Sequence, residues 1–275
     1  MPTHVLSATL GCAPSGARLA RRPASARRAQ ATRCVANEPN AGLSSSFARV
    51  FVAGATGETG SAVVARLVAE GVAVRALVRD PSSAAARALP TTVERVQGDV
   101  SDVPALVAAL KGCDAVVCAT GVRPSLDPTG PYRVDFVGTV NLVAAASKTR
   151  VKHYTLVTSI GVEDVLFPLN LAWGVLLCKK AGEEALQRSG LRYTIVRPGG
   201  LRSQGAPAPV VLRPGGSYGL PPRASPSGSI LRSQVAELCV ASLTTPAAAN
   251  AVVEAVTDAA APVMAPAALF EAALR

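Results

Sequence analysis

A glycine-rich loop constrains the fold of this chain more than any other feature. Between an apolar run and an amphipathic run lies the sequence Gly54-Ala55-Thr56-Gly57-Glu58-Thr59-Gly60. The first glycine permits a sharp turn, the second lets the backbone approach a phosphate, and the third lets a helix pack close to the preceding strand. Amides at the positive end of that helix can then bind a pyrophosphate. The loop therefore predicts a strand–turn–helix unit that binds a dinucleotide.

The alternation of strands and helices continues after this loop. Short Val-rich runs are typical of strands that are covered on both faces. Strands are predicted over residues 49–53, 72–78, 93–96, 115–119, 154–158, 192–196 and 251–255, and helices over 58–70, 82–89, 103–111, 133–147, 176–188, 233–243 and 265–274. This order predicts the α/β class, with a doubly wound parallel sheet, right-handed crossovers and an NAD(P)-binding Rossmann fold. Residues 202–229 are dense in Gly, Pro and Ser and predict a small, loop-rich C-terminal cap that closes over a site.

The end of the second strand distinguishes the two nicotinamide cofactors. An acidic residue there would bind the ribose 2′-hydroxyl of NAD, whereas an arginine accommodates the 2′-phosphate of NADP. The strand ends in Val78-Arg79-Asp80, so Arg79 predicts NADP(H), and Asp80 is expected to cap the next helix. Asp99 closes the third strand and is a candidate for the adenine edge, with a role in the turn as the alternative.

The first 47 residues differ in composition from the rest of the chain. They carry six arginines, no lysine and one acidic residue, whereas the whole chain has a net charge of +10. An Arg-, Ala- and Ser-rich, acid-poor start predicts an organelle transit peptide and linker, with a disordered basic arm as the alternative. Residues 48–275 are then the Rossmann domain. Outside the N-terminal segment the charge is not clustered and aromatic residues are few, which disfavours nucleic-acid binding. The six cysteines form no C-x-x-C pair, and no metal site is predicted.

Several further motifs resemble the atypical short-chain dehydrogenase/reductases. They are LVRD at 77–80, GDV at 98–100, VVCATG at 116–121, VDFVGTVNLV at 134–143 and YTIVRPGG at 193–200. The chain is most similar to a plastid NAD(P)-binding subgroup, which resembles the redox-sensing component of the chloroplast inner-envelope translocon and, more distantly, biliverdin and flavin reductases. The resemblance implies cofactor contacts at Val100, Ala119, Thr120, Gly121 and Pro198. It also implies a chloroplast location, in the stroma or at the thylakoid or plastoglobule surface.

The catalytic positions of that family are only partly present. Lys179 matches the lysine that holds the cofactor ribose. Ser159 matches the serine that can hydrogen-bond a substrate carbonyl, with hydrogen bonding at the end of its strand as the alternative. The family's proton-donating tyrosine precedes its lysine by four residues, and that position is Val175 here. Asp135 stands where the family often has an asparagine. The resemblance therefore implies a nicotinamide site without the usual Tyr–Lys chemistry.

Two functions remain open on the sequence alone. The first is an NADPH-dependent reductase of a small conjugated or lipophilic plastid metabolite, because such acceptors take hydride on a conjugated system and a proton from water, whereas a ketone needs a positioned acid. The second is a non-catalytic NADP(H) sensor that acts on a protein or membrane partner. The missing tyrosine favours the sensor, whereas the retained Lys179 and Ser159 favour the reductase. The apolar segment 165–178 beside Lys179 fits core packing, a lipophilic pocket or peripheral contact with a membrane or plastoglobule.

Overall fold

The computed structural model describes residues 41–122, 126–224 and 228–275. Most of the predicted transit peptide, residues 1–40, lies outside the described part. The predicted linker differs from the structure, because residues 41–46 form helix α1 (Ala41–Ser46). Leu43 is 1% exposed and belongs to the hydrophobic core, so ordered structure begins before residue 48.

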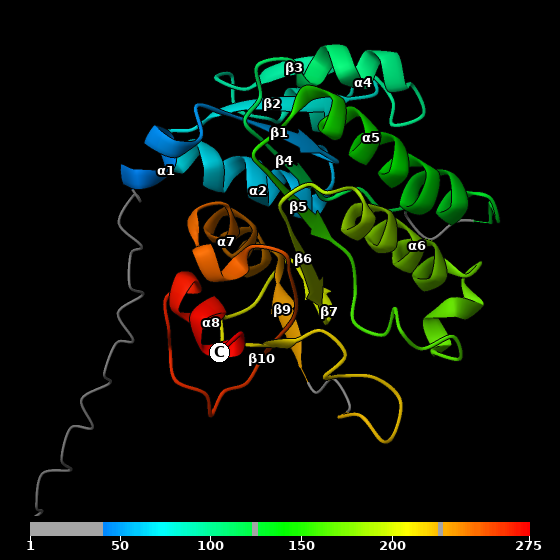
Figure 1. Cartoon of the computed structure of the whole chain (residues 1–275), viewed down its shortest axis with the longest axis vertical. Helices are drawn as coiled ribbons and strands as arrows, with labels where there is room; N and C mark the ends of the chain where they lie inside the picture. Colours follow the sequence, from blue (N-terminus) through cyan, green and yellow to red (C-terminus); the bar gives the residue numbers. More distant parts are fainter. Residues whose placement is uncertain (1–40, 123–125, 225–227) are drawn as a thin grey trace, which may run out of the picture. The chain divides into compact units, whose positions relative to one another are not determined.

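Eight strands form one twisted sheet in the order β3-β2-β1-β4-β5-β6-β10-β8 (Figure 1). Their neighbours pair in parallel except for β8, which runs antiparallel to β10 at the edge. The strand order reverses between β1 and β4, as in a doubly wound fold. This confirms the predicted sheet. The strands are β1 (Arg49–Ala53), β2 (Ala73–Val78), β3 (Glu94–Gln97), β4 (Ala115–Cys118), β5 (His153–Val157), β6 (Tyr193–Pro198), β8 (Val210–Pro214) and β10 (Ala251–Thr257).

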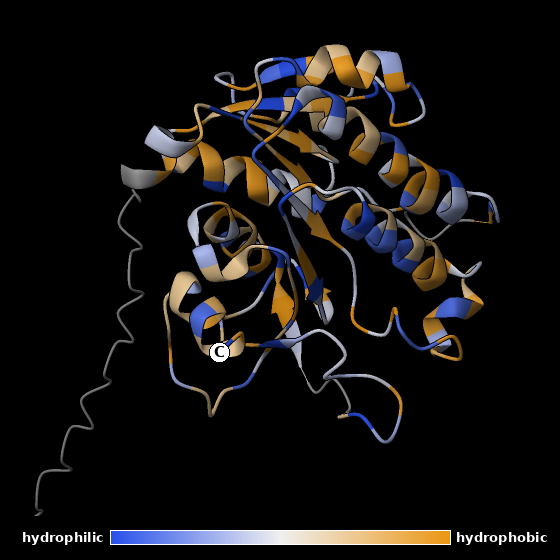
Figure 2. Cartoon of the chain, viewed as in Figure 1, coloured by the Kyte–Doolittle hydropathy of each residue, from blue (hydrophilic) through white to orange (hydrophobic). Residues whose placement is uncertain are grey.

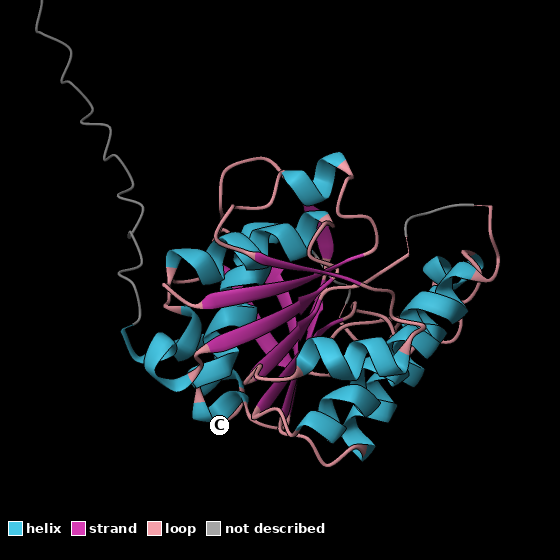
Figure 3. Ribbon diagram, turned by 90° about the horizontal axis from the view of Figure 1, so that it is seen from above, coloured by secondary structure: helices cyan, strands magenta, loops and turns pink. Residues whose placement is uncertain are grey.

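Helices cover both faces of the sheet (Figure 3). Alternate residues of β1 show the two layers, because Val50 and Val52 pack in one core cluster and Phe51 and Ala53 in the other. The first cluster includes residues of α1, α2 (Glu58–Ala69), α7 (Arg232–Thr244) and α8 (Pro266–Ala273), and the second includes residues of α4 (Val103–Leu110), α5 (Thr139–Thr149) and α6 (Val175–Arg188). The mostly apolar colour of β1 and β4 in Figure 2 agrees with burial of these strands on both faces.

Two segments differ from their predicted structure. The helix predicted over 133–147 begins as a π-helical segment, η1 (Tyr132–Gly138), and continues as α5. Within the predicted loop region 202–229, β8 extends the main sheet, and β9 (Ser229–Leu231) pairs in parallel with β7 (Gly200–Arg202). The sequence prediction missed β8, although its first residues Val210-Val211-Leu212 favour a strand, because the run is short and lies between Pro209 and Pro214.

Shorter elements complete the described chain. They are α3 (Ala84–Arg87), the 3-10 turn η2 (Pro168–Leu171) before α6 and the 3-10 turn η3 (Pro246–Ala248) before β10. Among the described helices, none combines the length and apolarity that a membrane crossing requires.

Candidate dinucleotide site

The glycine loop connects β1 to α2 at the carboxyl edge of the sheet. Gly54 has φ +79°, and a Cβ on this residue would lie 2.5 Å from the carbonyl oxygen of Ala119 on the neighbouring strand connection. A Cβ on Gly60 would overlap the carbonyl group of Gly54. Gly57 is the N-cap of α2, and its amide donates to the carbonyl of Gly54 at 2.9 Å. The loop is therefore closed on itself and exposes backbone at the start of the helix.

A cavity of about 640 Å³ lies against this loop. Its walls come from the glycine loop and from the segments that follow β2, β3 and β4, which is where open α/β sheets bind ligands. The described residues that line it are Gly54, Thr56, Gly57, Leu77, Arg79, Asp80, Ser83, Ala85, Gly98, Asp99, Val100, Ala119, Thr120, Gly121, Val122 and Val134.

Most of the predicted cofactor residues meet at this cavity. Those that line it are Gly54, Thr56, Gly57, Arg79, Asp99, Val100, Ala119, Thr120 and Gly121. The predicted residues that are not among its lining are Ala55, Glu58, Thr59, Gly60, Ser159, Lys179 and Pro198. Ala55 is fully buried, and Pro198 is the last residue of β6. Glu58 points away and pairs with Arg232, Nε to Oε2 at 3.2 Å.

Arg79 and its neighbours form one end of the cavity. Arg79 is exposed, so its guanidinium is accessible from solvent. Asp80 accepts hydrogen bonds from Ser82, 2.8 Å from the amide and 2.6 Å from the hydroxyl, and these bonds lower the pKa of Asp80. The prediction that Asp80 caps the next helix was wrong, because Ser83 is the N-cap of α3 and accepts from the amide of Ala86.

Asp99 both lines the cavity and stabilises a turn. Its Oδ1 accepts from the amide of Ser101 at 2.9 Å and from the hydroxyl of Ser101 at 2.7 Å. These bonds lower the pKa of Asp99, and the positive charges of Arg79 and Arg133 contribute further. Among the described residues no hydrogen bond to Oδ2 of Asp99 is found, so this oxygen can face a ligand while Oδ1 holds the turn.

Lys179 lies beside the opposite end of the cavity, in the first turns of α6. Its Nζ is 2.5 Å from Oδ1 of Asp135, whose side chain is 1% exposed. Oδ2 of Asp135 accepts from the amide of Val122 at 3.3 Å. A Cβ on Gly121 would lie 3.6 Å from Nζ of Lys179, so the ion pair stands directly behind the cavity wall. The π-helical turn of η1 carries Asp135, and such turns are frequent at functional sites.

Thr158 and Ser159 follow β5 at the carboxyl edge of the sheet. Ser159 donates its hydroxyl to the carbonyl of Ile160 at 3.0 Å, which is a local contact. Thr158 donates to Oε1 of Glu183 at 2.6 Å. Glu183 is one turn along α6 from Lys179 and is fully buried. The role predicted for Ser159 stays a prediction, and the structure shows that its neighbour Thr158 contacts α6.

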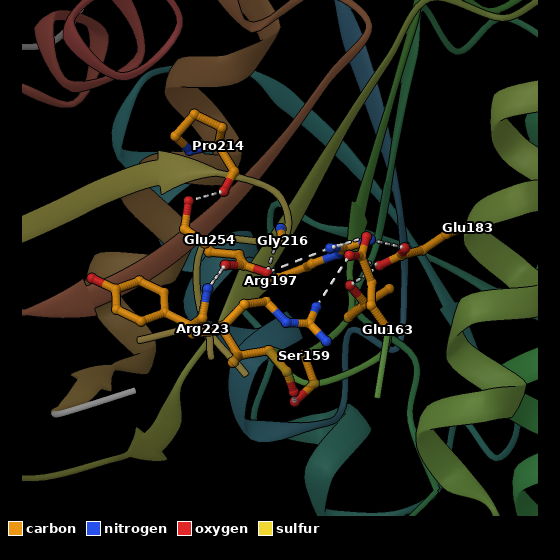
Figure 4. Close-up of polar contacts among 12 residues, drawn as sticks. Ser159, Glu163, Glu183, Arg197, Pro214, Gly216, Arg223 and Glu254 are labelled. Atoms are coloured by element: carbon orange, nitrogen blue, oxygen red, sulfur yellow. Dashed lines mark hydrogen bonds and ion pairs between the residues drawn. The ribbon is translucent and has the colours of Figure 1, made fainter. Parts of the chain in front are cut away.

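A buried ionic cluster surrounds Glu183 (Figure 4). Arg197 of β6 contacts Glu183, Glu163 and Glu254, with its Nη1 2.9 Å from Oε1 of Glu163 and 3.4 Å from Oε1 of Glu254. Burial alone would lower the pKa of Arg197, but the hydrogen bonds and charges of Glu183 and Glu163 raise it above its ordinary value. Glu254 also accepts from the amide of Gly216 at 3.0 Å, so the cluster fixes the loop after β8.

Sequence reasoning did not identify several residues of the cavity wall. They are Leu77, Asp80, Ser83, Ala85, Gly98, Val122 and Val134. Most of them adjoin a predicted contact at the end of a strand, so extending each motif by its neighbours would have found them. The family resemblance marks Asp135 and Lys179 but not their ion pair, and the Arg197 cluster has no local signal, because the members come from different elements.

The residues present fit a dinucleotide. The close approach of backbone at Gly54 and Gly57 leaves room for a pyrophosphate at the start of α2. The described N-cap of α2 contributes no side chain to its first amides, so these amides can bind phosphate oxygens. Arg79 adds a guanidinium at the end of β2, whereas the ammonium of Lys179 stands behind the wall near the end of β4 in its ion pair with Asp135. The amides of α2 and Arg79 suit an anionic ligand.

Comparison with known proteins agrees with this geometry. Residues 54–246 match the family described as NAD(P)H-binding. An uncharacterized chloroplastic protein of Arabidopsis thaliana is 40% identical over 226 residues, covering 78% of each chain. The chloroplastic protein TIC 62 of Oryza sativa is 43% identical over 175 residues, which are 55% of this chain and 35% of that protein. Sanguinarine reductase of Eschscholzia californica is 31% identical, covering 70% of this chain and 83% of the reductase.

Solved structures share the fold. A protein of Bacillus halodurans described as a putative NAD-dependent epimerase/dehydratase superposes with a TM-score of 0.70 at 25% identity, covering 82% of this chain and 99% of its own. The anaerobilin reductase ChuY of Escherichia coli has a TM-score of 0.62 at 23% identity over 78% of this chain and all of its own, which shows the fold alone. With its glycine loop, doubly wound sheet and matching residues 54–246, the chain belongs to the NAD(P)H-binding family of Rossmann-fold proteins.

Proposed function

We propose that the chain is an NADP(H)-dependent reductase of a small conjugated or lipophilic metabolite. The observation that carries the proposal is the cavity at the glycine loop, with the retained Lys179 directly behind its wall at Gly121. The bound cofactor would supply a hydride. The chain supplies no tyrosine at the family position, which disfavours ketone substrates that need a proton donor there.

The choice of NADP(H) rests on Arg79. The residue lines the cavity at the end of β2, where the ribose 2′-substituent of a Rossmann cofactor lies. Asp80 would be the competing ribose ligand, but Ser82 already donates two hydrogen bonds to its Oδ1. The guanidinium of Arg79 faces solvent, and the carboxylate of Asp80 is already hydrogen-bonded to Ser82. This arrangement favours the 2′-phosphate of NADP(H) over the 2′-hydroxyl of NAD(H).

The apolar segment next to α6 supports a lipophilic partner. Leu166 is 85% exposed, Leu171 90% and Trp173 53%, so these three side chains do not pack in the core, unlike the buried Leu176 of the same segment. We propose that it contacts a lipophilic acceptor or a lipid surface. Co-sedimentation with lipid vesicles should fall in the variant Leu166→Ser/Leu171→Ser and remain in Val263→Ser, which alters an exposed apolar residue elsewhere. Equal sedimentation of all three chains would count against lipid contact.

The second candidate is a non-catalytic NADP(H) sensor. The ion pair of Lys179 with Asp135 favours this candidate, because it binds the ammonium of the family lysine to a carboxylate of the protein itself. Incubation of the full chain with NADPH and a panel of quinones, flavins and bilins separates the two. Oxidation of NADPH above the protein-free rate supports the reductase, whereas binding without oxidation across the panel supports the sensor.

The chloroplastic relatives also support a chloroplast location, which import into isolated chloroplasts would test.

A further inference from the structure

The buried ion pair of Asp135 and Lys179 stands behind the half of the cavity that follows β4. In a doubly wound fold the first three strands carry the adenosine half of the cofactor, and the strands beyond the reversal carry the nicotinamide half. Gly121 follows β4, and a Cβ there would lie 3.6 Å from Nζ of Lys179 and 3.7 Å from Oδ1 of Asp135. Both charges of the pair are therefore next to the nicotinamide half of the site.

The pair is held from several directions. Asp135 contacts Lys179 through Oδ1 at 2.5 Å and the amide of Val122 through Oδ2 at 3.3 Å. The carbonyl of Asp135 accepts from the hydroxyl of Thr139 at 2.8 Å, and a Cβ on Gly182 would lie 3.0 Å from the same oxygen. Because η1 packs tightly on α6 here, the carboxylate has a fixed position.

We propose that Asp135 sets the preference of this site for the oxidised or the reduced cofactor. The two forms differ by one positive charge on the nicotinamide ring. A lysine alone would repel the oxidised ring, and the adjacent carboxylate cancels this repulsion. With an asparagine at position 135, no carboxylate would offset the positive charge of Lys179. The inference rests on the proposed NADP(H) binding and concerns only the ratio of the two affinities.

The test is the ratio of Kd for NADP+ to Kd for NADPH, measured by titration calorimetry on the full chain. Asp135→Asn keeps the shape and an acceptor for Val122 but removes the charge. We expect the ratio to rise by about tenfold, which corresponds to about 1.4 kcal/mol. Asp135→Glu keeps the negative charge, so its ratio should lie closer to that of the wild type than the ratio of Asp135→Asn. Lys179→Gln should lower the ratio, and it provides a second variant if Asp135→Asn does not fold.

Asp99→Asn is the matched control, because it removes a carboxylate from the adenosine half of the same cavity. It can change both affinities, but the ratio should stay within about twofold of the wild type, since the adenosine parts of the two cofactors are identical. A ratio that Asp135→Asn and Lys179→Gln leave unchanged would overturn the inference while NADP(H) binding stands. Failure of the wild type to bind either nucleotide would overturn the proposed function itself.

Discussion

The guanidinium of Arg197 faces the carboxylate of Glu183 in a two-point contact, with Nε 3.0 Å from Oε1 and Nη2 2.7 Å from Oε2. Arg197 comes from β6 and Glu183 from α6, so the contact fixes the helix that carries Lys179 against the sheet. Both side chains are at most 2% exposed. A charge at this depth is stable only while its partner is present.

Arg197→Met should therefore destabilise the protein strongly. Removal of one partner from a buried ion pair costs about 3–5 kcal/mol, because the remaining charge is uncompensated. Glu183 and Glu254 would both lose their cation. Urea unfolding followed by circular dichroism measures the loss. Arg188→Ala on the same helix is the control, since its pair with Glu184 is exposed and contributes under about 1 kcal/mol. Similar losses in the two variants would contradict the role of burial.

Arg79→Ala should change cofactor choice. Hydrogen bonds to a charged group contribute about 1.5–3 kcal/mol, so NADP(H) affinity should fall roughly ten- to a hundredfold. NAD(H), which has no 2′-phosphate, should lose less than about twofold by the same reasoning. Titration of both cofactors measures the difference, and Arg87→Ala on α3 is the control because Arg87 is absent from the described cavity wall. Equal losses for NADP(H) and NAD(H) would remove Arg79 from this role.

Gly60→Ala should abolish cofactor binding at the glycine loop. A methyl group on Gly60 would overlap the carbonyl of Gly54, so either α2 or the loop must move. Ser61→Ala is the matched control, because Ser61 is the next residue of α2 and its hydroxyl contacts only the carbonyl of Glu58 in the described hydrogen bonds. Fluorescence titration with NADPH measures binding, and circular dichroism shows whether the variant is folded. A folded Gly60→Ala with wild-type affinity would contradict the close packing.

The fold could be predicted from local patterns, and most of the cavity wall followed from it. Strand runs and the glycine loop are continuous in sequence, and the fold brings the strand ends together at one edge. The antiparallel place of β8 in the sheet could not be predicted, since it depends on pairing with the distant β10. The same holds for Asp135, 44 residues from Lys179, and for Glu183, 14 residues from Arg197. Such pairs depend on how η1, α6 and β6 pack, and no spacing rule encodes that arrangement.

Because His153 is buried, we expect the protein to lose stability in mild acid. Its ring lies in β5 and contacts Thr194 at 3.0 Å, and burial, with the charge of Arg192 as a smaller cause, lowers its pKa to about 4 from 6.5. Because the folded pKa lies below the unfolded one, protonation favours the unfolded chain. The stabilisation is complete above about pH 6.5 and is lost as pH falls toward about 4.

The expected loss between pH 7.5 and pH 5 is about 2 kcal/mol in the free energy of unfolding, from linkage of the two pKa values. His153→Gln keeps a hydrogen-bonding side chain but cannot take up this proton. Between pH 7.5 and pH 5 the free energy of unfolding of this variant should therefore fall by about 2 kcal/mol less than that of the wild type, because the carboxylates titrate alike in both chains. The chain has two histidines, and the other, His4, lies outside the described residues. Urea unfolding at both pH values gives the comparison, and parallel losses in the two proteins would exclude His153 as the source.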